Sequence, residues 1–412
     1  MTDRLEQNKE EDMNKSRHLL IFSILTIGLA FFACKNSAKT EQTNALYTDP
    51  TKQNFSSNPD LRDRIRSGPH GYFRFINKQF AGEVCRRFEA IIADNPSVNL
   101  HGDAHIEQYA VTDLGRGLTD YDDSASGPGI IDLVRFGVSL RLACHEQGWA
   151  EKADDLSAQF LRGYREALEH PETEAPEPEV VKRIRSEFTF DRESYLSWVD
   201  SVMQPVSAEE RTALWEAILP YVGDMSAENP DLNANYFDVK KIGYLRMGIG
   251  SALDIKYLFR VEGPSNLATD DVILECKQVR DLSGIPCITS GKSNDPFRVL
   301  IGQARIAYEP FHHLGYFTFR GITLWVHSWV DNYKEVKIGQ TFRSIDEMAE
   351  VAYDVGVQLG RGHVKHIGDP LELQIRRKQL EIIRTHETDI TQACRELEAL
   401  TIAAWQEFCT KL

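Results

Sequence analysis

The sequence has few cysteines, and none of them is spaced like the ligands of a structural zinc ion. Seven cysteines occur among 412 residues, and no two form a Cys-x-x-Cys pair. The six that follow Cys34 are an even number, which permits disulfides in an exported protein, but their wide spacing does not require them. We expect mostly buried free thiols at Cys85, Cys144, Cys276, Cys287, Cys394 and Cys409.

The chain also lacks an excess of basic residues. It contains 47 Lys and Arg against 62 Asp and Glu, which gives a net charge of −15. Proteins that bind nucleic acid use basic side chains to displace counterions from phosphates, so this balance excludes nucleic acid as the main partner. No low-complexity tract or internal repeat is present, and a composition of 42% hydrophobic and 26% charged residues indicates a globular protein.

One long apolar run is present, near the N-terminus. Residues 19–33 are uncharged and mostly apolar, which is short for a membrane-spanning helix but typical of a signal-peptide core. A basic start precedes the run, and Cys34 and a polar stretch follow it. This order resembles a bacterial lipoprotein signal and predicts export to the cell envelope, with Cys34 as the lipid attachment to the membrane. The alternative is an uncleaved anchor or a plain signal peptide.

The order of the predicted elements indicates an α+β fold. Apolar residues recur at i, i+3 and i+4 in stretches such as "DLVRFGVSLRLACHEQ", whereas strands and a hairpin turn at Arg320-Gly321 are gathered in one later block. Such segregation excludes a doubly wound α/β fold. We expect a signal peptide (1–34), a tether (35–58), a helical catalytic lobe (59–236), a β-rich lobe (237–340) and C-terminal helices that pack on the helical lobe (341–412).

Two neighbouring segments, "HGDAHIEQ" (101–108) and "TDYDDSASGPG" (119–129), contain many carboxylates. Carboxylates this close repel one another unless a cation or a proton lies among them. Gln108, Asp120 and Asp122 have the oxygen atoms that Mg²⁺ prefers. We expect Asp113 and Asp123 to be turn formers or helix caps.

The histidines of the first segment allow a second interpretation. His101, Asp103 and His105 alternate, so an extended strand would place them on one side, as in a zinc site. With the aspartates they would form a metal-dependent phosphohydrolase, which needs no nucleotide. We favour the alternative that His101 braces the loop through hydrogen bonds. His327 and His363 are expected to be ordinary core or surface residues.

The β-rich block supplies groups suited to phosphate. The glycines of "GIGS" lie in a predicted hairpin, where backbone N–H groups can approach a phosphate; the candidates are Gly248, Gly250 and Ser251. Lys277 has apolar neighbours in a predicted strand, so its charge needs a partner, for which Glu309 is a candidate. The alternative is a solvent-facing lysine on an edge strand.

We expect these two halves of the chain to meet. A phosphate donor needs cation-binding carboxylates on one side and a positive charge on the other. Lys277 is therefore predicted to face Asp103 and Asp120 across a cleft, with the turn at 248–251 above the same cleft.

The motifs resemble those of known families. "HGDAHIEQ" followed by "LTDYDDSASGPGIIDLVR" is similar to the paired signatures of aminoglycoside and choline phosphotransferases, members of the protein-kinase-like superfamily. A closer resemblance, over residues 60–370, is to the domain-of-unknown-function family 2252, whose members add segments similar to "GIGS", "ECK" and "RVLIGQAR". The last segment contains Arg298, Gln303 and Arg305, to which no physical role is assigned.

The phosphotransferase resemblance implies a two-lobed kinase-like fold and Mg²⁺-dependent transfer of a phosphoryl or nucleotidyl group. The donor would be ATP or another nucleotide, and the acceptor an unknown hydroxyl compound, either a small molecule or part of the cell envelope. Asp103 would be the catalytic base, Gln108 and Asp120 would bind the metal, and Lys277 would bind the donor phosphates. Structural support is expected from His101, His105, Asp132 and Arg135.

Two features depart from the phosphotransferase pattern. Gln108 replaces an Asn, which moves the amide oxygen one methylene further out. The helical lobe precedes the β-rich lobe, so the fold would be a circularly permuted kinase. ATP is also scarce outside the cytoplasm. Three alternatives follow: the export signal is misleading, the donor is another compound, or the chain is a catalytically inactive binding module.

Overall fold

The computed structural model describes residues 44–412, apart from residues 54, 56–58, 248–253 and 290–294. Helices contain 54% of the described residues and sheets contain 14%, which confirms the α+β class. The predicted signal peptide with Cys34, residues 35–43 of the tether and the turn with Gly248, Gly250 and Ser251 lie outside the described residues. None of the helices in the described part of the chain has the length and apolar character needed to cross a membrane.

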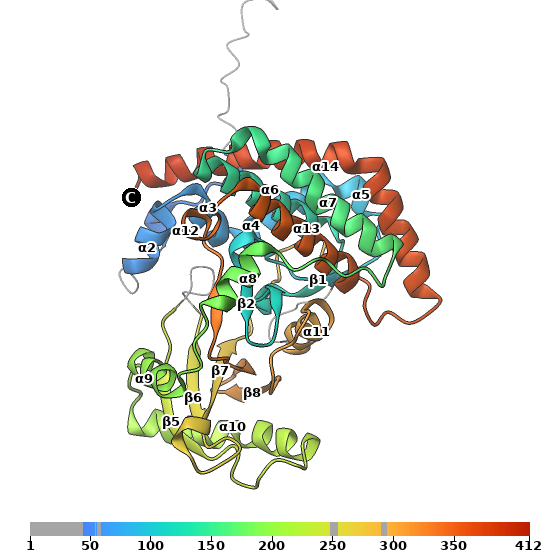
Figure 1. Ribbon diagram of the computed structural model, residues 1–412. Helices are drawn as coiled ribbons and strands as arrows, with labels where there is room; N and C mark the ends of the chain where they lie inside the picture. Colours follow the sequence, from blue (N-terminus) through green and yellow to red (C-terminus); the bar gives the residue numbers. More distant parts are fainter. Residues whose placement is uncertain (1–43, 54, 56–58, 248–253, 290–294) are drawn as a thin grey trace, which may run out of the picture. The chain divides into compact units, whose positions relative to one another are not determined.

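The larger share of the helices forms one packed group (Figure 1). Its members are α2 (Pro59–Arg66), α3 (Pro69–Phe75), α4 (Asn77–Arg87), α5 (Glu89–Ile92), α6 (Ile130–Gln147), α7 (Ala153–Glu169), α8 (Glu179–Ser186), α12 (Ile338–Thr341), α13 (Ile345–Gly362) and α14 (Leu371–Thr410). Helices α7 and α13 approach closely, because a Cβ atom at Gly356 would lie 2.1 Å from the carbonyl oxygen of Phe160. The buried helix α6 starts at Ile130 and contains the stretch "DLVRFGVSLRLACHEQ", which the sequence predicts to be helical.

A five-stranded antiparallel sheet follows in the chain, in the order β5-β6-β7-β9-β8. Its strands are β5 (Val239–Tyr244), β6 (Lys256–Val261), β7 (Val272–Gln278), β8 (Gly315–Phe319) and β9 (Ile322–Ser328). The hairpin turn at Arg320-Gly321 is confirmed, with both residues at positive φ. Lys277 lies on β7, the central strand, and is buried, so the edge-strand interpretation of this lysine is wrong.

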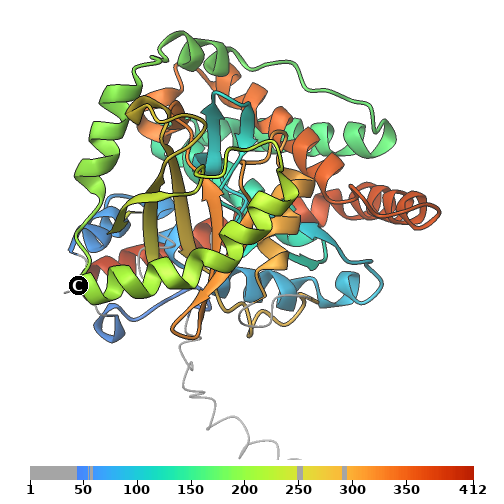
Figure 2. The ribbon, with the colours of Figure 1, turned by 90° about the horizontal axis from the view of Figure 1, so that it is seen from below.

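The two faces of this sheet contact different partners. Helix α10 (Ala208–Glu228) crosses one face (Figure 2), where Leu214 and Ile218 pack against Leu274 and Leu324. Helix α9 (Arg192–Val202) also packs on sheet residues. Because side chains alternate along a strand, Lys277 and the other odd-numbered residues of β7 point away from α10. Lys277 points toward Asp120 in the acidic segment, whereas Ile273 on the same face packs with α9.

Two shorter sheets and helix α11 (Phe297–Ile306) connect the helical group to the five-stranded sheet. Strand β1 (Val98–Leu100) pairs with β4 (Ala125–Gly127), and β2 (Tyr109–Thr112) pairs with β3 (Arg116–Leu118) and β10 (Tyr333–Glu335). Strand β10 follows β9 closely in sequence and pairs with β2. This pairing holds the five-stranded sheet beside residues 101–105, which we call the "HGDAH" loop.

A disulfide makes a second connection. Cys85 on α4 is bonded to Cys287, which lies between β7 and α11, with an S–S distance of 2.03 Å. The other four described cysteines are free. Cys144, Cys276 and Cys394 are buried, and Cys409 is half-buried. The expectation of buried free thiols is confirmed for Cys144, Cys276 and Cys394, whereas it is wrong for Cys85 and Cys287, whose disulfide was not predicted.

Part of the segment that the sequence assigns to a tether is packed on the helices. The side-chain amide of Asn44 donates to the carbonyl of Leu400 at 2.8 Å. Leu46 is fully buried, and its carbonyl accepts a hydrogen bond from the Tyr72 hydroxyl at 2.7 Å. The packed part of the chain therefore begins by Asn44.

Candidate functional site

The "HGDAH" loop is held by Asp132, in the first turn of α6. The Asp132 carboxylate accepts the backbone N–H groups of His101 at 2.7 Å and Gly102 at 2.8 Å. Gly102 has a φ of 81°, and a Cβ atom there would lie 1.9 Å from the carbonyl oxygen of Asp123. Only glycine fits at this position. The loop is thereby packed against the acidic turn that contains Asp123.

Asp103, in the same loop, is buried and bound through one oxygen. Arg135 on α6 donates to Asp103 Oδ1 through Nε at 3.0 Å and Nη2 at 2.7 Å. The Asp103 Oδ2 atom receives no hydrogen bond from Arg135. Burial raises the pKa of Asp103 to about 7, against the opposing effect of the Arg135 charge. An oriented carboxylate with a pKa near neutrality is suited to accept a proton from a substrate.

The two histidines of the loop face inward and do not line the cavity described below. His101 Nε2 donates to the carbonyl of Thr119 at 2.9 Å, and His101 Nδ1 accepts the Asp103 N–H at 3.3 Å. Both ring nitrogens of His101 are thus engaged within the site's own backbone. The ring nitrogens of the buried His105 have no hydrogen-bond partner among the described residues, and His105 Nε2 lies 3.9 Å from Asp103 Oδ2.

The acidic turn meets the sheet at Lys277. Asp120, with a φ of 60°, precedes a 3₁₀ turn over Tyr121–Asp123. Lys277 Nζ lies 2.6 Å from Asp120 Oδ1 and 2.7 Å from Asp122 Oδ2. The predicted meeting of Lys277 with Asp120 is confirmed. Glu309 is the wrong partner, because α11 ends at Ile306 and the Glu309 side chain lies beside Gly115 instead.

Asp120 and Asp122 have different environments. Asp120 lines the cavity, and its Oδ2 atom accepts a hydrogen bond from Gln108 Nε2 at 3.2 Å. Burial alone would raise the pKa of Asp120, but Lys277 holds it well below its usual range. Asp122 is not among the lining residues of the cavity, and its Oδ1 atom accepts the Trp325 indole N–H at 2.9 Å. Burial and the charge of Asp120 raise the pKa of Asp122 to about 7. Gln108 and Asp120 are therefore the predicted metal ligands that a cation in the cavity can reach.

Arginines from the second half of the chain fix the acidic turn. Arg280, just after β7, forms ion pairs with Asp123 and, at 3.6 Å, with Asp122. Arg298 on α11 donates to the carbonyl of Asp122 at 2.7 Å and to that of Arg280 at 2.8 Å. Asp123 is thus a turn residue, as expected, but its carboxylate is ion-paired. Arg298, which had no assigned role, joins the turn to the end of β7.

The remaining residues of the α11 segment lie on either side of this contact. Arg305 donates to Asn99 Oδ1 at 2.8 Å. Gln303 lines the cavity, and its buried Oε1 atom has no hydrogen-bond partner among the described residues.

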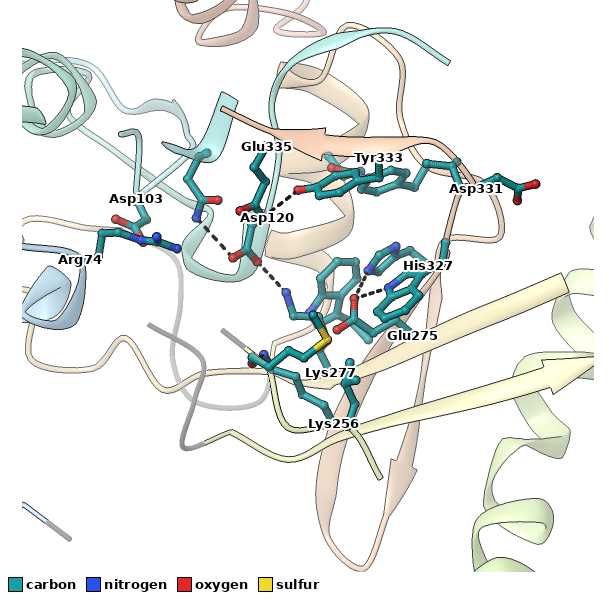
Figure 3. A pocket seen from close by; sticks show the side chains of 18 of the residues that line it. Arg74, Asp103, Asp120, Lys256, Glu275, Lys277, His327, Asp331, Tyr333 and Glu335 are labelled. Atoms are coloured by element: carbon teal, nitrogen blue, oxygen red, sulfur yellow. Dashed lines mark hydrogen bonds and ion pairs between the residues drawn. The ribbon is translucent and has the colours of Figure 1, made fainter. Parts of the chain in front are cut away.

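A cavity of about 490 Å³ unites these groups (Figure 3). Asp103, Gln108, Asp120 and Lys277 all line it. On the sheet side, the rings of Phe311, His327 and Trp325 are stacked with centroid distances of 4.8 and 4.7 Å. Trp198 on α9 stacks on Trp329 at 5.7 Å and extends this aromatic wall. The cavity thus combines a charged centre with an aromatic side.

A buried carboxylate stands in the aromatic wall. Glu275 Oε2 accepts hydrogen bonds from His327 Nε2 at 3.0 Å and from the Trp329 indole at 2.8 Å. Burial would raise the pKa of Glu275, but Lys277 and His327 lower it to about 2. His327 is therefore part of the cavity lining. His363, in contrast, is a core residue, with hydrogen bonds to Tyr164 and Asp132.

The sequence was compared with known families and structures. The family model described as "Uncharacterized protein conserved in bacteria (DUF2252)" matches residues 61–204 and 186–411, which together span nearly all of the described chain. The chain belongs to the DUF2252 family. No curated protein matches it, and no solved structure does.

The DUF2252 match includes both halves of the site. The "HGDAH" loop and the acidic turn lie in the first matched range, and Lys277 and Arg298 lie in the second. For this DUF2252 chain, neither Arg280 nor Trp325 nor the rest of the aromatic wall was predicted from the sequence. The sequence feature that could have revealed the wall is the alternation of side chains between the two faces of β7 and β9. It places Glu275, Lys277, Trp325 and His327 on one face of the sheet.

Proposed function

We propose that this DUF2252 chain is a kinase-like enzyme that transfers a phosphoryl or nucleotidyl group to a hydroxyl acceptor with the help of Mg²⁺. The observation that carries the proposal is the meeting of Lys277 with Asp120 in a cavity that Asp103 also lines. Phosphoryl transfer depends mainly on positioning and on charge stabilisation by lysine and metal ions. A positive charge, an ionised carboxylate and a candidate base in one cavity supply these elements.

Magnesium fits the donor set of the cavity. Asp120 and Gln108 are hydrogen-bonded neighbours with oxygen atoms, which are the ligands that Mg²⁺ takes. The described residues contain no cluster of three or more His, Cys, Asp and Glu side chains able to hold a metal. This agrees with a site in which one carboxylate and donor phosphates share the ion. When bound there, Mg²⁺ would neutralise charge on the transferred phosphate.

The protein's own groups divide the remaining work. Lys277 keeps its charge in the cavity, since Asp120 and Asp122 raise its pKa despite burial. It can therefore exchange a carboxylate contact for a donor phosphate oxygen. Asp103 Oδ2 would accept the proton of the acceptor hydroxyl, and Arg135 would hold the carboxylate in place through Oδ1.

The aromatic wall favours a donor with a planar group. Flat rings stack on aromatic side chains with a gain of roughly 1–3 kcal/mol per base in nucleic-acid-binding proteins. Trp198, at 45% exposure, leaves a ring accessible beside the cavity. A nucleotide base bound there would place its phosphates toward Lys277.

The proposal includes a permuted kinase-like fold. A central strand that carries the phosphate-binding lysine and a helical part that carries the base and the metal-binding carboxylate are the two halves of a kinase site. Here the helical half comes first in the chain and the sheet second.

We also propose that the chain is exported and anchored through Cys34. The Cys85–Cys287 disulfide supports export, because disulfides form and persist in oxidising compartments. Replacement of Cys34 by serine should abolish fatty-acid labelling and release the protein from membrane fractions, whereas labelling that persists in Cys34→Ser would contradict the anchor.

Phosphorus NMR on the purified protein with Mg-ATP and a cell-envelope extract tests the proposed function. Loss of the γ-phosphate signal with a new phosphate-ester signal indicates phosphoryl transfer, and release of pyrophosphate indicates nucleotidyl transfer. Both signals should be absent with Asp103→Asn. Unchanged ATP together with tightly bound zinc would favour the phosphohydrolase, and unchanged ATP without zinc would favour a binding module.

A further inference from the structure

The cavity has two chemically different ends, on either side of the Asp120–Lys277 ion pair. In Figure 3, Arg74 and Asp103 lie on one side of this pair, and Glu275 and His327 lie on the other. The Glu275 end contains the stacked aromatic rings. The Asp103 end has no equivalent aromatic stack among the described lining residues, and its lining is basic.

Three basic side chains form this end, and we name them the basic cluster: Arg64 on α2, Arg74 on α3 and Lys337, which precedes α12. Arg74 interacts electrostatically with Arg64. The carboxylate of Glu107 contacts both Arg74 and the backbone N–H of Ile338, the residue after Lys337. The three cations are therefore neighbours.

The nearby carboxylates do not balance the basic cluster. Arg74 Nη1 pairs with Glu107 at 2.9 Å, and Lys337 pairs with Glu335 at 2.6 Å. Arg64 donates to the carbonyl of Asp60 at 3.2 Å and forms no ion pair with a described residue. Arg64 is therefore the one cation of the cluster without an ion pair to a described carboxylate, and only the charge of the Asp60 carboxylate, which is not in direct contact with it, opposes its own.

Hydrogen-bond donors also remain unused in the cluster. The Nε atom of Arg74 is buried without a hydrogen-bond partner among the described residues. Two adjacent guanidinium groups repel each other, and burial and Arg74 both lower the pKa of Arg64. An oxyanion between the two groups would remove this repulsion and accept the free N–H groups, because guanidinium forks match carboxylate and phosphate oxygens.

We propose that the acceptor is an anionic hydroxyl compound whose phosphate or carboxylate binds at Arg64 and Arg74, with its hydroxyl at Asp103. This inference rests on the proposed function, because it assigns the acceptor to the end of the cavity opposite the aromatic wall. Asp103 contributes no excess negative charge there, since its carboxylate forms an ion pair with Arg135. A cationic acceptor would face the basic cluster and be repelled.

Calorimetric titration with glycerol 3-phosphate, glycerate, glycerol and choline tests this assignment. The key variant is Arg64→Met, which removes the cation without an ion pair and retains an apolar stem. Its matched control is Arg62→Met on the same helix, where the side chain is 45% exposed and paired with Asp63.

We expect the two anions to bind at least ten times more tightly than glycerol or choline to the wild type and to Arg62→Met. Arg64→Met should lose at least ten-fold in anion affinity. Equal anion affinities of Arg64→Met and Arg62→Met, or equal affinities for glycerol and glycerol 3-phosphate, would overturn the inference.

A Mg-ATP titration of the same proteins keeps the two proposals apart. Mg-ATP binding that is retained in Arg64→Met while the anions fail to bind the wild type refutes the anionic acceptor only. Absence of Mg-ATP binding to the wild type refutes the donor half of the proposed function, whatever the anions do.

Discussion

At the scale of single residues, the site depends on buried charges whose partners come from distant parts of the chain. Asp103 and Lys277 could be singled out from sequence, because a carboxylate between small residues and a lysine in a largely apolar strand both need an explanation beyond packing. The wrong partner Glu309 shows the limit of that reasoning. The register of β7 against the acidic turn decides which carboxylate Lys277 meets, and no local pattern encodes it.

The raised pKa of Asp103 predicts an acid limb in the pH profile. A base must be deprotonated, so kcat/KM should fall as the pH drops through about 7 and level off above it. Asp103→Asn should lower kcat by roughly 10²–10⁴-fold and remove the limb. Asp113→Asn, a turn residue outside the cavity lining, is the control and should keep the wild-type profile. An unchanged limb in Asp103→Asn would exclude Asp103 as the base.

Removal of the Lys277 charge should destabilise the protein in a pH-dependent way. Lys277→Met leaves Asp120 and Asp122 without their shared cation, which costs about 3–5 kcal/mol for a buried pair. The loss should be smaller at pH 5 than at pH 7, because protonation of a buried carboxylate relieves it. Urea unfolding at both pH values measures this. The exposed variant Lys182→Met should change little, and a Lys277→Met loss as small as that would contradict the buried ion pair.

At the scale of secondary-structure elements, several boundaries follow from local chemistry. The start of α6 after the "GPG" segment and the β8–β9 turn were predictable because Gly and Pro restrict the backbone there. The packing partners of the elements were not predictable. The apolar sides of α9 and α10 pack on the sheet, although nothing in their helical sequence pattern distinguishes them from the preceding helices, which pack on one another.

The contact of α3 with the "HGDAH" loop predicts a loss of stability in acid. Burial lowers the pKa of His70 to about 3 and holds that of His105 well below its usual value. Between pH 6.5 and 3 the unfolded chain binds protons at His70 that the folded chain does not bind. Stability should therefore fall as the pH drops, by up to about 2 kcal/mol for His70 between pH 6.5 and 5.

His70→Gln isolates this effect from the carboxylates that titrate in the same range. Burial raises the pKa of Asp103, so its protonation in the folded state acts in the opposite direction. Urea midpoints at pH 7 and 5 should differ less for His70→Gln than for the wild type. The partly exposed His386→Gln should match the wild type, and equal pH dependence of all three would show that His70 protonates in the folded state.

At the scale of the whole molecule, the site needs two segments that lie more than a hundred residues apart in sequence to stay in contact. Strand β10 and the Cys85–Cys287 disulfide join the parts of the chain that carry them. The α+β class could be predicted because strands and helices are segregated along the sequence. The disulfide could not, because 202 residues separate its cysteines and only the folded chain brings them together.

Replacement of both Cys85 and Cys287 by serine should lower the free energy of unfolding by about 2–4 kcal/mol, because the unfolded chain gains conformational freedom. Cys394→Ser, at a buried free thiol, is the control for loss of a sulfur atom from the core. The double variant should also show a lower melting temperature than the wild type under non-reducing conditions. Identical melting temperatures with and without reductant in the wild type would contradict a stabilising disulfide.

The meeting of Lys277 and Asp120 as a site for a metal-bound phosphate donor is tested most directly by calorimetric titration with Mg-ATP. Wild-type protein should bind Mg-ATP and bind ATP much more weakly in the presence of EDTA, because Asp120 and Gln108 interact with the donor through the ion. Asp120→Asn should lose the dependence on Mg²⁺, and Lys277→Met should lose at least ten-fold in affinity, with Lys182→Met unchanged. Binding of Mg-ATP with the same affinity by wild type, Asp120→Asn and Lys277→Met would contradict the assignment of this cavity to a phosphate donor.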